Sequence, residues 1–130
     1  MLVPARETEI FRVTDDLAEV MAAQGFSPGA VREISAAVKE VMENVVRHGY
    51  RGRAGSIRVC CTASPEKVTV EISDSAPAYN PLKGPGPHTR PGETVAGRLG
   101  LAFVQQAADI VSYRHRDHRN ILTLVKIRRQ

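Results

Sequence analysis

The most informative stretch of this sequence is Glu40-Val41-Met42-Glu43-Asn44-Val45-Val46-Arg47-His48. If the stretch is helical, steps of four residues place Glu40, Asn44 and His48 along one stripe of the helix. The other flanks are strongly apolar, so the stripe is expected at the edge of a core. A carboxylate that can take a proton, beside an amide that can bind a hard cation, is what Mg²⁺-dependent phosphate chemistry needs.

The helix that carries this stripe is expected to begin at Ser27-Pro28 and to end near His48-Gly49. Ser is a good N-cap, and Pro is favoured at the first helical position. Apolar residues then recur at steps of three and four, at Val31, Ile34, Val38, Val41, Met42 and Val45. Before this helix we expect a short strand over residues 8–13 and a first helix from an N-cap at Thr14 to a stop at Gly25.

Two hairpins are expected in the second half of the chain. Residues 57–62 and 68–72 form the first, and residues 110–113 and 121–127 form the second, around a turn at 117–120. A third helix is expected to open at Leu99 and to run to about Ala108. Hairpins pair neighbouring strands antiparallel, so the sequence predicts an α+β two-layer sandwich, with a mixed, mostly antiparallel sheet of about five strands and three helices on one face.

The segment 75–98 has a different composition from the rest of the chain. It holds five of the eight prolines and several glycines, and this density of breakers excludes a helix or a strand. A long stretch of this kind inside a small domain is usually a lid or a binding loop. We therefore expect a lid at residues 75–98 within one domain that spans residues 1–130.

The bulk composition narrows the class of protein. With 42% hydrophobic and 25% charged residues, the chain is neither disordered nor a membrane protein, and its N-terminus lacks the pattern of a secretory signal, so a cytoplasmic location is expected. The net charge is +4, and many of the basic residues come late, at Arg114, His115, Arg116, His118, Arg119, Lys126, Arg128 and Arg129. They form either a solvated hairpin face or a patch for an acidic protein or a polyanion. No aromatic interleaving or nucleic-acid module accompanies them, so no direct nucleic-acid partner is expected.

Three segments together resemble the GHKL ATPase superfamily, which has the histidine-kinase-like ATPase fold. Residues 38–50 are similar to its N box, and Val70-Glu71-Ile72-Ser73-Asp74 with the following Pro77, Tyr79, Asn80 and Pro81 is similar to its first glycine box. Residues 97–104 are similar to the second glycine box. Within the superfamily the chain looks most like the small serine kinases that act as anti-sigma factors in bacterial partner switching.

The resemblance implies a role for each motif residue. Glu40 is the general base that orients or deprotonates the attacking hydroxyl, and Asn44 holds Mg²⁺ with the nucleotide phosphates. Asp74 accepts a hydrogen bond from the amino group of adenine. His48 is either structural or close to the phosphates.

The second glycine box is expected to bind phosphate. Gly97 and Gly100 let the backbone approach the phosphates. The helix begins at Leu99, and the N–H groups of its first turn, including Leu101, point at the phosphates. Arg98 either pairs with a phosphate or faces solvent. Arg98 stands where the family often has glycine, and Ala76 stands where the first box normally has glycine, so both bear on nucleotide affinity.

The resemblance therefore predicts an ATP- and Mg²⁺-dependent serine/threonine protein kinase that is an anti-sigma factor. Its expected partners are a sigma factor and a STAS-domain antagonist that it phosphorylates, and it is expected to form a homodimer through its first strand and helix. Two alternatives stay open: a non-catalytic switch of the same fold that sequesters a partner, and a basic scaffold for nucleic acid.

Overall fold

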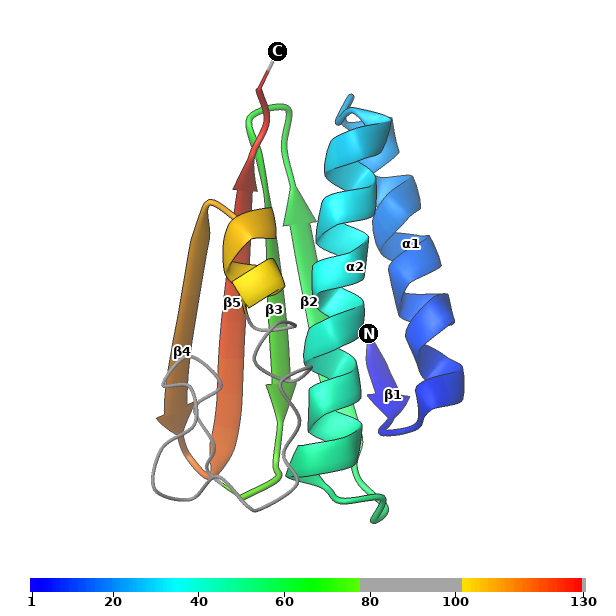
Figure 1. Cartoon of the computed structure of the whole chain (residues 1–130), viewed down its shortest axis with the longest axis vertical. Helices are drawn as coiled ribbons and strands as arrows, with labels where there is room; N and C mark the ends of the chain where they lie inside the picture. The colour runs from blue at the N-terminus through cyan, green and yellow to red at the C-terminus, as the bar shows by residue number, and fades with distance from the viewer. Residues whose placement is uncertain (78–101, 130) are drawn as a thin grey trace.

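The computed structural model describes residues 1–77 and 102–129. Five strands form one sheet in the order β1-β2-β3-β5-β4, and every neighbouring pair is antiparallel. The helices α1 and α2 and a short helical segment at residues 102–107 cover one face of this sheet (Figure 1). The elements are β1 (Leu2–Pro4), α1 (Ile10–Ala23), α2 (Pro28–Asn44), β2 (Ser56–Ala63), β3 (Lys67–Asp74), β4 (Ile110–Arg116) and β5 (Arg119–Ile127). The predicted α+β two-layer architecture is confirmed.

The helix α2 begins where the sequence predicts. The Ser27 hydroxyl accepts a hydrogen bond from the Ala30 N–H at 3.1 Å, and Pro28 is the first helical residue. The predicted apolar stripe faces the core, where α2 buries Ile34, Ala37, Val38, Val41 and Met42. The α-helix ends at Asn44 and passes into a π-helical turn over Val45–Gly49, so the stretch up to His48 is not one uniform α-helix as the spacing predicted.

The N-terminal prediction was wrong in two respects. The first strand is β1, and residues 8–13 lie in a 3₁₀ turn (Glu7–Glu9) and the first turn of α1. Ile10 and Val13 are three residues apart and continue the buried stripe of Leu17 and Met21, so their spacing is helical. Thr14 is an interior helix residue, not an N-cap, and its hydroxyl donates to the Phe11 carbonyl at 3.2 Å. The predicted stop at Gly25 is confirmed by its φ of +87°.

The two predicted hairpins bring distant residues into register on the covered face of the sheet. β3 pairs with β2 on one side and with β5 on the other, and its inward side chains Val68, Val70 and Ile72 are buried. Asp117 and His118 both have positive φ (54° and 61°), as in the two-residue turns that match the twist of a hairpin. This turn sets the register that places Asn120 directly opposite Asp74.

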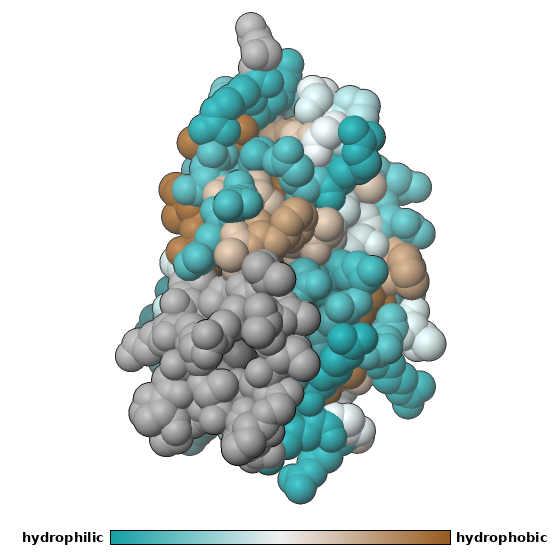
Figure 2. Space-filling model, viewed as in Figure 1, coloured by the Kyte–Doolittle hydropathy of each residue, from teal (hydrophilic) through white to brown (hydrophobic). Residues whose placement is uncertain are grey.

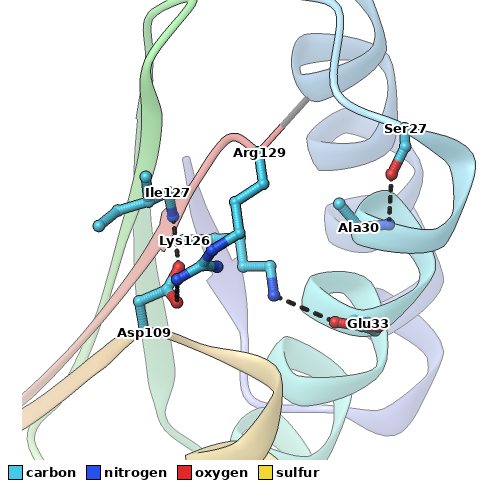
Figure 3. Close-up of polar contacts among 7 residues, drawn as sticks. All are labelled: Ser27, Ala30, Glu33, Asp109, Lys126, Ile127 and Arg129. Atoms are coloured by element: carbon cyan, nitrogen blue, oxygen red, sulfur yellow. Dashed lines mark hydrogen bonds and ion pairs between the residues drawn. The ribbon is translucent and has the colours of Figure 1, made fainter.

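Charged contacts fasten the end of the sheet where β5 finishes (Figure 3). Asp109, which follows the helical segment 102–107, accepts the Ile127 N–H at 2.6 Å and pairs with Arg129 at 2.7 Å. The Arg129 hydrogen bond holds the pKa of the Asp109 carboxyl below its ordinary value. Lys126 of β5 pairs with Glu33 of α2 at 3.1 Å, and this contact ties the helix to the sheet.

The covered face of the molecule is uneven in polarity. Figure 2 shows hydrophobic side chains gathered over the 102–107 segment and β4, whereas the lower part of α2 is mostly hydrophilic. Among residues 1–77 and 102–129, no helix combines the length and apolar character needed to cross a bilayer.

The N-cap of α2 gives a direct test of this local structure. Ser27→Ala should lower the free energy of unfolding by about 1 kcal/mol, because the Ala30 N–H loses its acceptor. Urea unfolding followed by circular dichroism measures this loss. The matched control is Ser112→Ala on the exposed side of β4, which should change stability by less than about 0.5 kcal/mol. Equal effects of the two substitutions would contradict the capping role.

Candidate functional site

Glu40 and Asn44 lie one turn apart on the flank of α2 that faces away from α1. Glu33 occupies the same flank and contacts Lys126 of β5, which fixes the direction in which this flank points. Both Glu40 and Asn44 are half-buried. Neither side chain forms a hydrogen bond or ion pair with any residue that the structure describes, so a carboxylate and an amide stand side by side with their polar atoms available to a ligand.

His48 does not join this pair in the same way. It lies in the π-helical turn Val45–Gly49, which is wider than an α-helical turn, and its side chain is exposed. The turn is held by the Tyr50 N–H, which donates to the Val45 carbonyl at 2.8 Å, and by the ion pair of Arg47 with Glu7 at 2.7 Å. His48 therefore marks the rim of the site.

Asp74 ends β3 as a buried carboxylate, with only 5% of its surface exposed. One oxygen, Oδ1, accepts two hydrogen bonds, from the Ala76 N–H at 2.9 Å and from the Asn120 side-chain amide at 2.9 Å. Within the described chain the other oxygen, Oδ2, accepts none. Burial raises the pKa of Asp74 above its ordinary value, and the hydrogen bonds from Asn120 and Ala76 oppose that rise.

Ala76 brings the end of β3 against the end of α2. Its side chain is buried, and a Cβ placed on Gly49 would lie 3.2 Å from the Ala76 methyl group. The methyl group that replaces the expected glycine hydrogen thus points at the π-helical turn. The absence of a side chain at Gly49 makes this close approach possible.

Tyr50 makes a second connection between the same two elements. Its hydroxyl donates to the Ser56 carbonyl at 2.7 Å and accepts the Ser75 N–H at 2.9 Å. Its ring lies over Gly55, where an added Cβ would clash with the ring. Tyr50 and Ala76 thus connect the segment just after Asp74 to the π-helical turn that follows Asn44.

Sequence reasoning missed two residues of this site, Asn120 and Tyr113. The Tyr113 hydroxyl donates to Oδ1 of Asn120, and the Asn120 amide donates to the carbonyls of Ala76 at 3.0 Å and Pro77 at 3.3 Å as well as to Asp74. One signal was available: Asn120 is a polar residue at an inward position of β5, in line with the buried Leu122 and Leu124. Its partner Asp74 is 46 residues away, so the contact itself could not be read from local pattern.

Five predicted residues of the second glycine box lie outside the described part of the chain: Gly97, Arg98, Leu99, Gly100 and Leu101. Most of the predicted lid, residues 78–98, lies outside it as well. The described residues place Glu40 and Asn44 on one flank of α2 and place Asp74 and Ala76 at the end of β3, which Ala76 and Tyr50 connect to the turn after α2.

The described part of the site suits a ligand that brings both donors and a cation. Within residues 1–77 and 102–129, no cluster of three His, Cys, Asp or Glu side chains is placed to hold a metal ion. Asn44 and Glu40 offer only two oxygen-bearing side chains, which fits Mg²⁺ held mainly by phosphate oxygens of a ligand rather than by a cage of protein groups.

The raised pKa of Asp74 makes a prediction about stability. Because the folded state disfavours the ionised form, Asp74 should lower stability as the pH rises through the ordinary and then the raised pKa. Asp74→Asn keeps an acceptor for Ala76 and Asn120 without the charge. The variant should therefore be more stable than the wild type at neutral pH, and the difference should shrink in acid, as measured by urea unfolding across pH.

Asp109→Asn is the matched control with the opposite sign. The pKa of Asp109 is lowered by Arg129, so its contribution to stability is present above its ordinary pKa and is lost in acid. Asp109→Asn should be less stable than the wild type at neutral pH. If both variants shifted stability in the same direction, the electrostatic account of Asp74 would be wrong.

Comparison with known proteins identifies the family. Residues 3–126 match the histidine kinase-like ATPase domain. The chain is 23% identical over 136 aligned positions to the protein named Serine-protein kinase RsbW of Bacillus cereus (strain ZK / E33L), and the alignment covers 100% of this chain and 85% of the relative. Proteins of the same name from Bacillus thuringiensis subsp. konkukian (strain 97-27) and Bacillus mycoides (strain KBAB4) match with the same identity and coverage. Since the family match spans nearly the whole chain and agrees with the resemblance of the motifs, this protein belongs to the histidine kinase-like ATPase domain family.

Proposed function

We propose that this chain is an ATP- and Mg²⁺-dependent serine/threonine protein kinase that acts as an anti-sigma factor in a partner-switching module. The observation that carries the proposal is the set of open polar groups at the meeting point of α2 and β3. Glu40 and Asn44 have no partner among the described residues, and none of those residues donates to Oδ2 of the buried Asp74. Membership of the ATPase family and similarity to proteins named serine-protein kinase support the same reading.

The nucleotide spans the two ends of this site. Asp74 would accept a hydrogen bond from the amino group of adenine, and Asn44 would hold Mg²⁺ through its amide oxygen together with the nucleotide phosphates. Bound Mg²⁺ supplies neutralisation of the charge on the phosphates. As the family resemblance implies, Gly97, Arg98, Leu99, Gly100 and Leu101 would supply the remaining phosphate contacts, with His48 nearby.

Glu40 is the general base of the transfer. Its carboxylate accepts the proton of a serine or threonine hydroxyl while the hydroxyl oxygen forms a bond to the γ-phosphorus and the bond from that phosphorus to ADP breaks. Glu40 is half-buried beside Asn44, so a hydroxyl that gives its proton to Glu40 would lie next to the residue that would hold Mg²⁺. Positioning and charge neutralisation do most of the work in such a reaction, so few catalytic side chains suffice.

The acceptor is a STAS-domain antagonist, and the second partner is a sigma factor that the antagonist releases. The kinase is a homodimer through β1 and α1. These partners rest on the family resemblance, because the charge and shape of the described surface do not by themselves select them.

One alternative has an observation of its own. The Ala76 methyl group packs toward Gly49 at the place where the family pattern has no side chain, and Arg98 replaces a glycine of the phosphate loop. A switch that sequesters its partner without transferring phosphate would tolerate both changes. Label from γ-labelled ATP that appears on a serine or threonine of the antagonist would exclude this alternative.

Glu40→Gln tests the base. Phosphoryl transfer to the antagonist should fall by about 10²-fold or more, because the amide cannot take the proton, while the Kd for Mg-ATP should change little. Rates come from γ-labelled ATP, and affinities from calorimetry. Glu19→Gln on the exposed side of α1 is the control and should retain wild-type transfer. Full transfer by the Glu40 variant would remove this residue from the role of base.

Asn44→Ala tests the metal ligand. The affinity for ATP in Mg²⁺ should fall by about 10-fold or more, to the level that the wild type shows in EDTA, because the amide oxygen no longer completes the metal shell. In EDTA the two proteins should bind alike. Gln24→Ala, which removes another amide at the end of α1, should leave the Mg²⁺ dependence intact. An undiminished Mg²⁺ effect in Asn44→Ala would contradict metal binding by this residue.

A further inference from the structure

Asn120 links three parts of the site through one side chain. Its amide nitrogen lies 2.9 Å from Asp74 Oδ1, 3.0 Å from the Ala76 carbonyl and 3.3 Å from the Pro77 carbonyl. Its oxygen accepts the hydroxyl of Tyr113 on β4. The side chain therefore joins β5 to the end of β3, to the first residues after β3, and to β4.

We propose that Asn120, supported by Tyr113, is a positioning residue that sets the base preference of the nucleotide site. It holds Asp74 Oδ1 and the backbone at Ala76 and Pro77 so that Asp74 Oδ2 is presented to an amino group on the base. This inference rests on the proposed function, because it assigns Asp74 to base recognition.

The chemistry of the neighbours fixes the direction of the Asn120 amide. Asp74 Oδ1 and the two carbonyls are acceptors, so the NH₂ group must face them. The Tyr113 hydroxyl then meets the amide oxygen. A carboxylate could not replace this amide, since it has no hydrogen to donate, and a hydroxyl could donate only one hydrogen bond of the set.

Burial makes this arrangement selective. Asn120 and Asp74 are 6% and 5% exposed, so water cannot readily replace a missing partner. With both donors on Oδ1, Oδ2 remains an acceptor with a fixed direction. A base with an amino group at this place, as in adenine, supplies a donor. A base with a carbonyl oxygen there, as in guanine, would set acceptor against acceptor.

Asn120 also helps to keep Asp74 an acceptor. Burial favours the protonated form of Asp74 and raises its pKa, and the hydrogen bond from Asn120 is the largest influence in the other direction. Arg119 and His115 lie near enough to favour the anion as well. Without Asn120, the carboxyl group would lose both its fixed direction and part of what keeps it ionised.

The test compares the Kd values of ATP and GTP, measured by calorimetry in Mg²⁺ for the full chain. Asn120→Ala should raise the Kd for ATP by about tenfold or more and leave the Kd for GTP nearly unchanged, so that most of the preference for ATP is lost. Asn120→Ser, which can restore one donor, should recover part of the preference. Thr123→Ala on the outer side of β5 is the control and should keep the wild-type ratio.

Tyr113→Phe is the second variant and keeps the test open if Asn120→Ala does not fold. It removes only the hydroxyl that supports the amide, and it should reduce the ATP-to-GTP preference by a smaller factor, about threefold. If these residues had a purely structural role, the variants would lose affinity for ATP and GTP by the same factor, and their melting temperatures would fall in proportion.

The outcomes separate the two proposals. If the wild type binds ATP and the variants keep its preference for ATP over GTP, the positioning role is wrong and the kinase proposal stands. If the wild type binds no ATP at millimolar concentration, the kinase proposal is wrong and the positioning role is wrong with it.

Discussion

Asp74 ends a central strand with 5% of its surface exposed, and an ionised carboxylate so placed must be compensated by hydrogen-bond donors. Two donors, the Ala76 N–H and the Asn120 amide, meet one of its oxygens. Both come from segments whose position depends on the fold: Ala76 packs toward the end of α2, and Asn120 is fixed by the hairpin register of β5. The compensation of a single buried charge thus requires α2, β3, β4 and β5 to be in place together.

The contacts between the end of β3 and the turn after α2 also fix the position of the helix that carries Glu40 and Asn44. Tyr50 joins the Ser56 carbonyl to the Ser75 N–H, and the bare backbone of Gly49 admits the Ala76 methyl group. At its other end, α2 is tied to β5 through Glu33 and Lys126. A helix held at both ends presents its polar flank at a fixed place, which is what a site that works by positioning requires.

The sequence predicts those parts of this fold that depend on local pattern. Ser27 is a favourable N-cap, and the apolar stripe of α2 has the helical period. The alternation of Val68, Val70 and Ile72 has the period of a half-buried strand. The segment 8–13 misled because Thr, Ile, Phe and Val have strand propensity, whereas packing against the core selected the helical spacing of Ile10 and Val13. Local propensity lost to tertiary packing there.

Only the motif residues of the site could be predicted from the sequence. Glu40, Asn44 and Asp74 stand in recognisable patterns, but their partners do not: Tyr50 reaches Ser75 across 25 residues, and Asn120 reaches Asp74 across 46. Such contacts depend on the register between strands. If β5 were shifted by one residue relative to β3, the Asn120 side chain would point to the outer face of the sheet. The π-helical turn after Asn44 is a similar case, since nothing in the apolar period of α2 distinguishes it from a continuing α-helix.

The polar groups of the site also link the stability of the domain to its ligand. Glu40 and Asn44 are half-buried without a hydrogen-bond partner among the described residues, and Oδ2 of the buried Asp74 accepts no hydrogen bond from those residues either. Water can reach the unpaired atoms of these side chains, because among the described residues only the Ser35 hydroxyl is a fully buried side-chain polar atom without a hydrogen bond. A ligand that binds here must therefore replace this water with donors or a cation of its own. A ligand that supplies donors or a cation to all three groups has more contacts than one that reaches only the groups on α2, and tighter binding to the folded state stabilises that state more. That difference ties the stability of the domain to the identity of the base as well as to the presence of phosphate and metal.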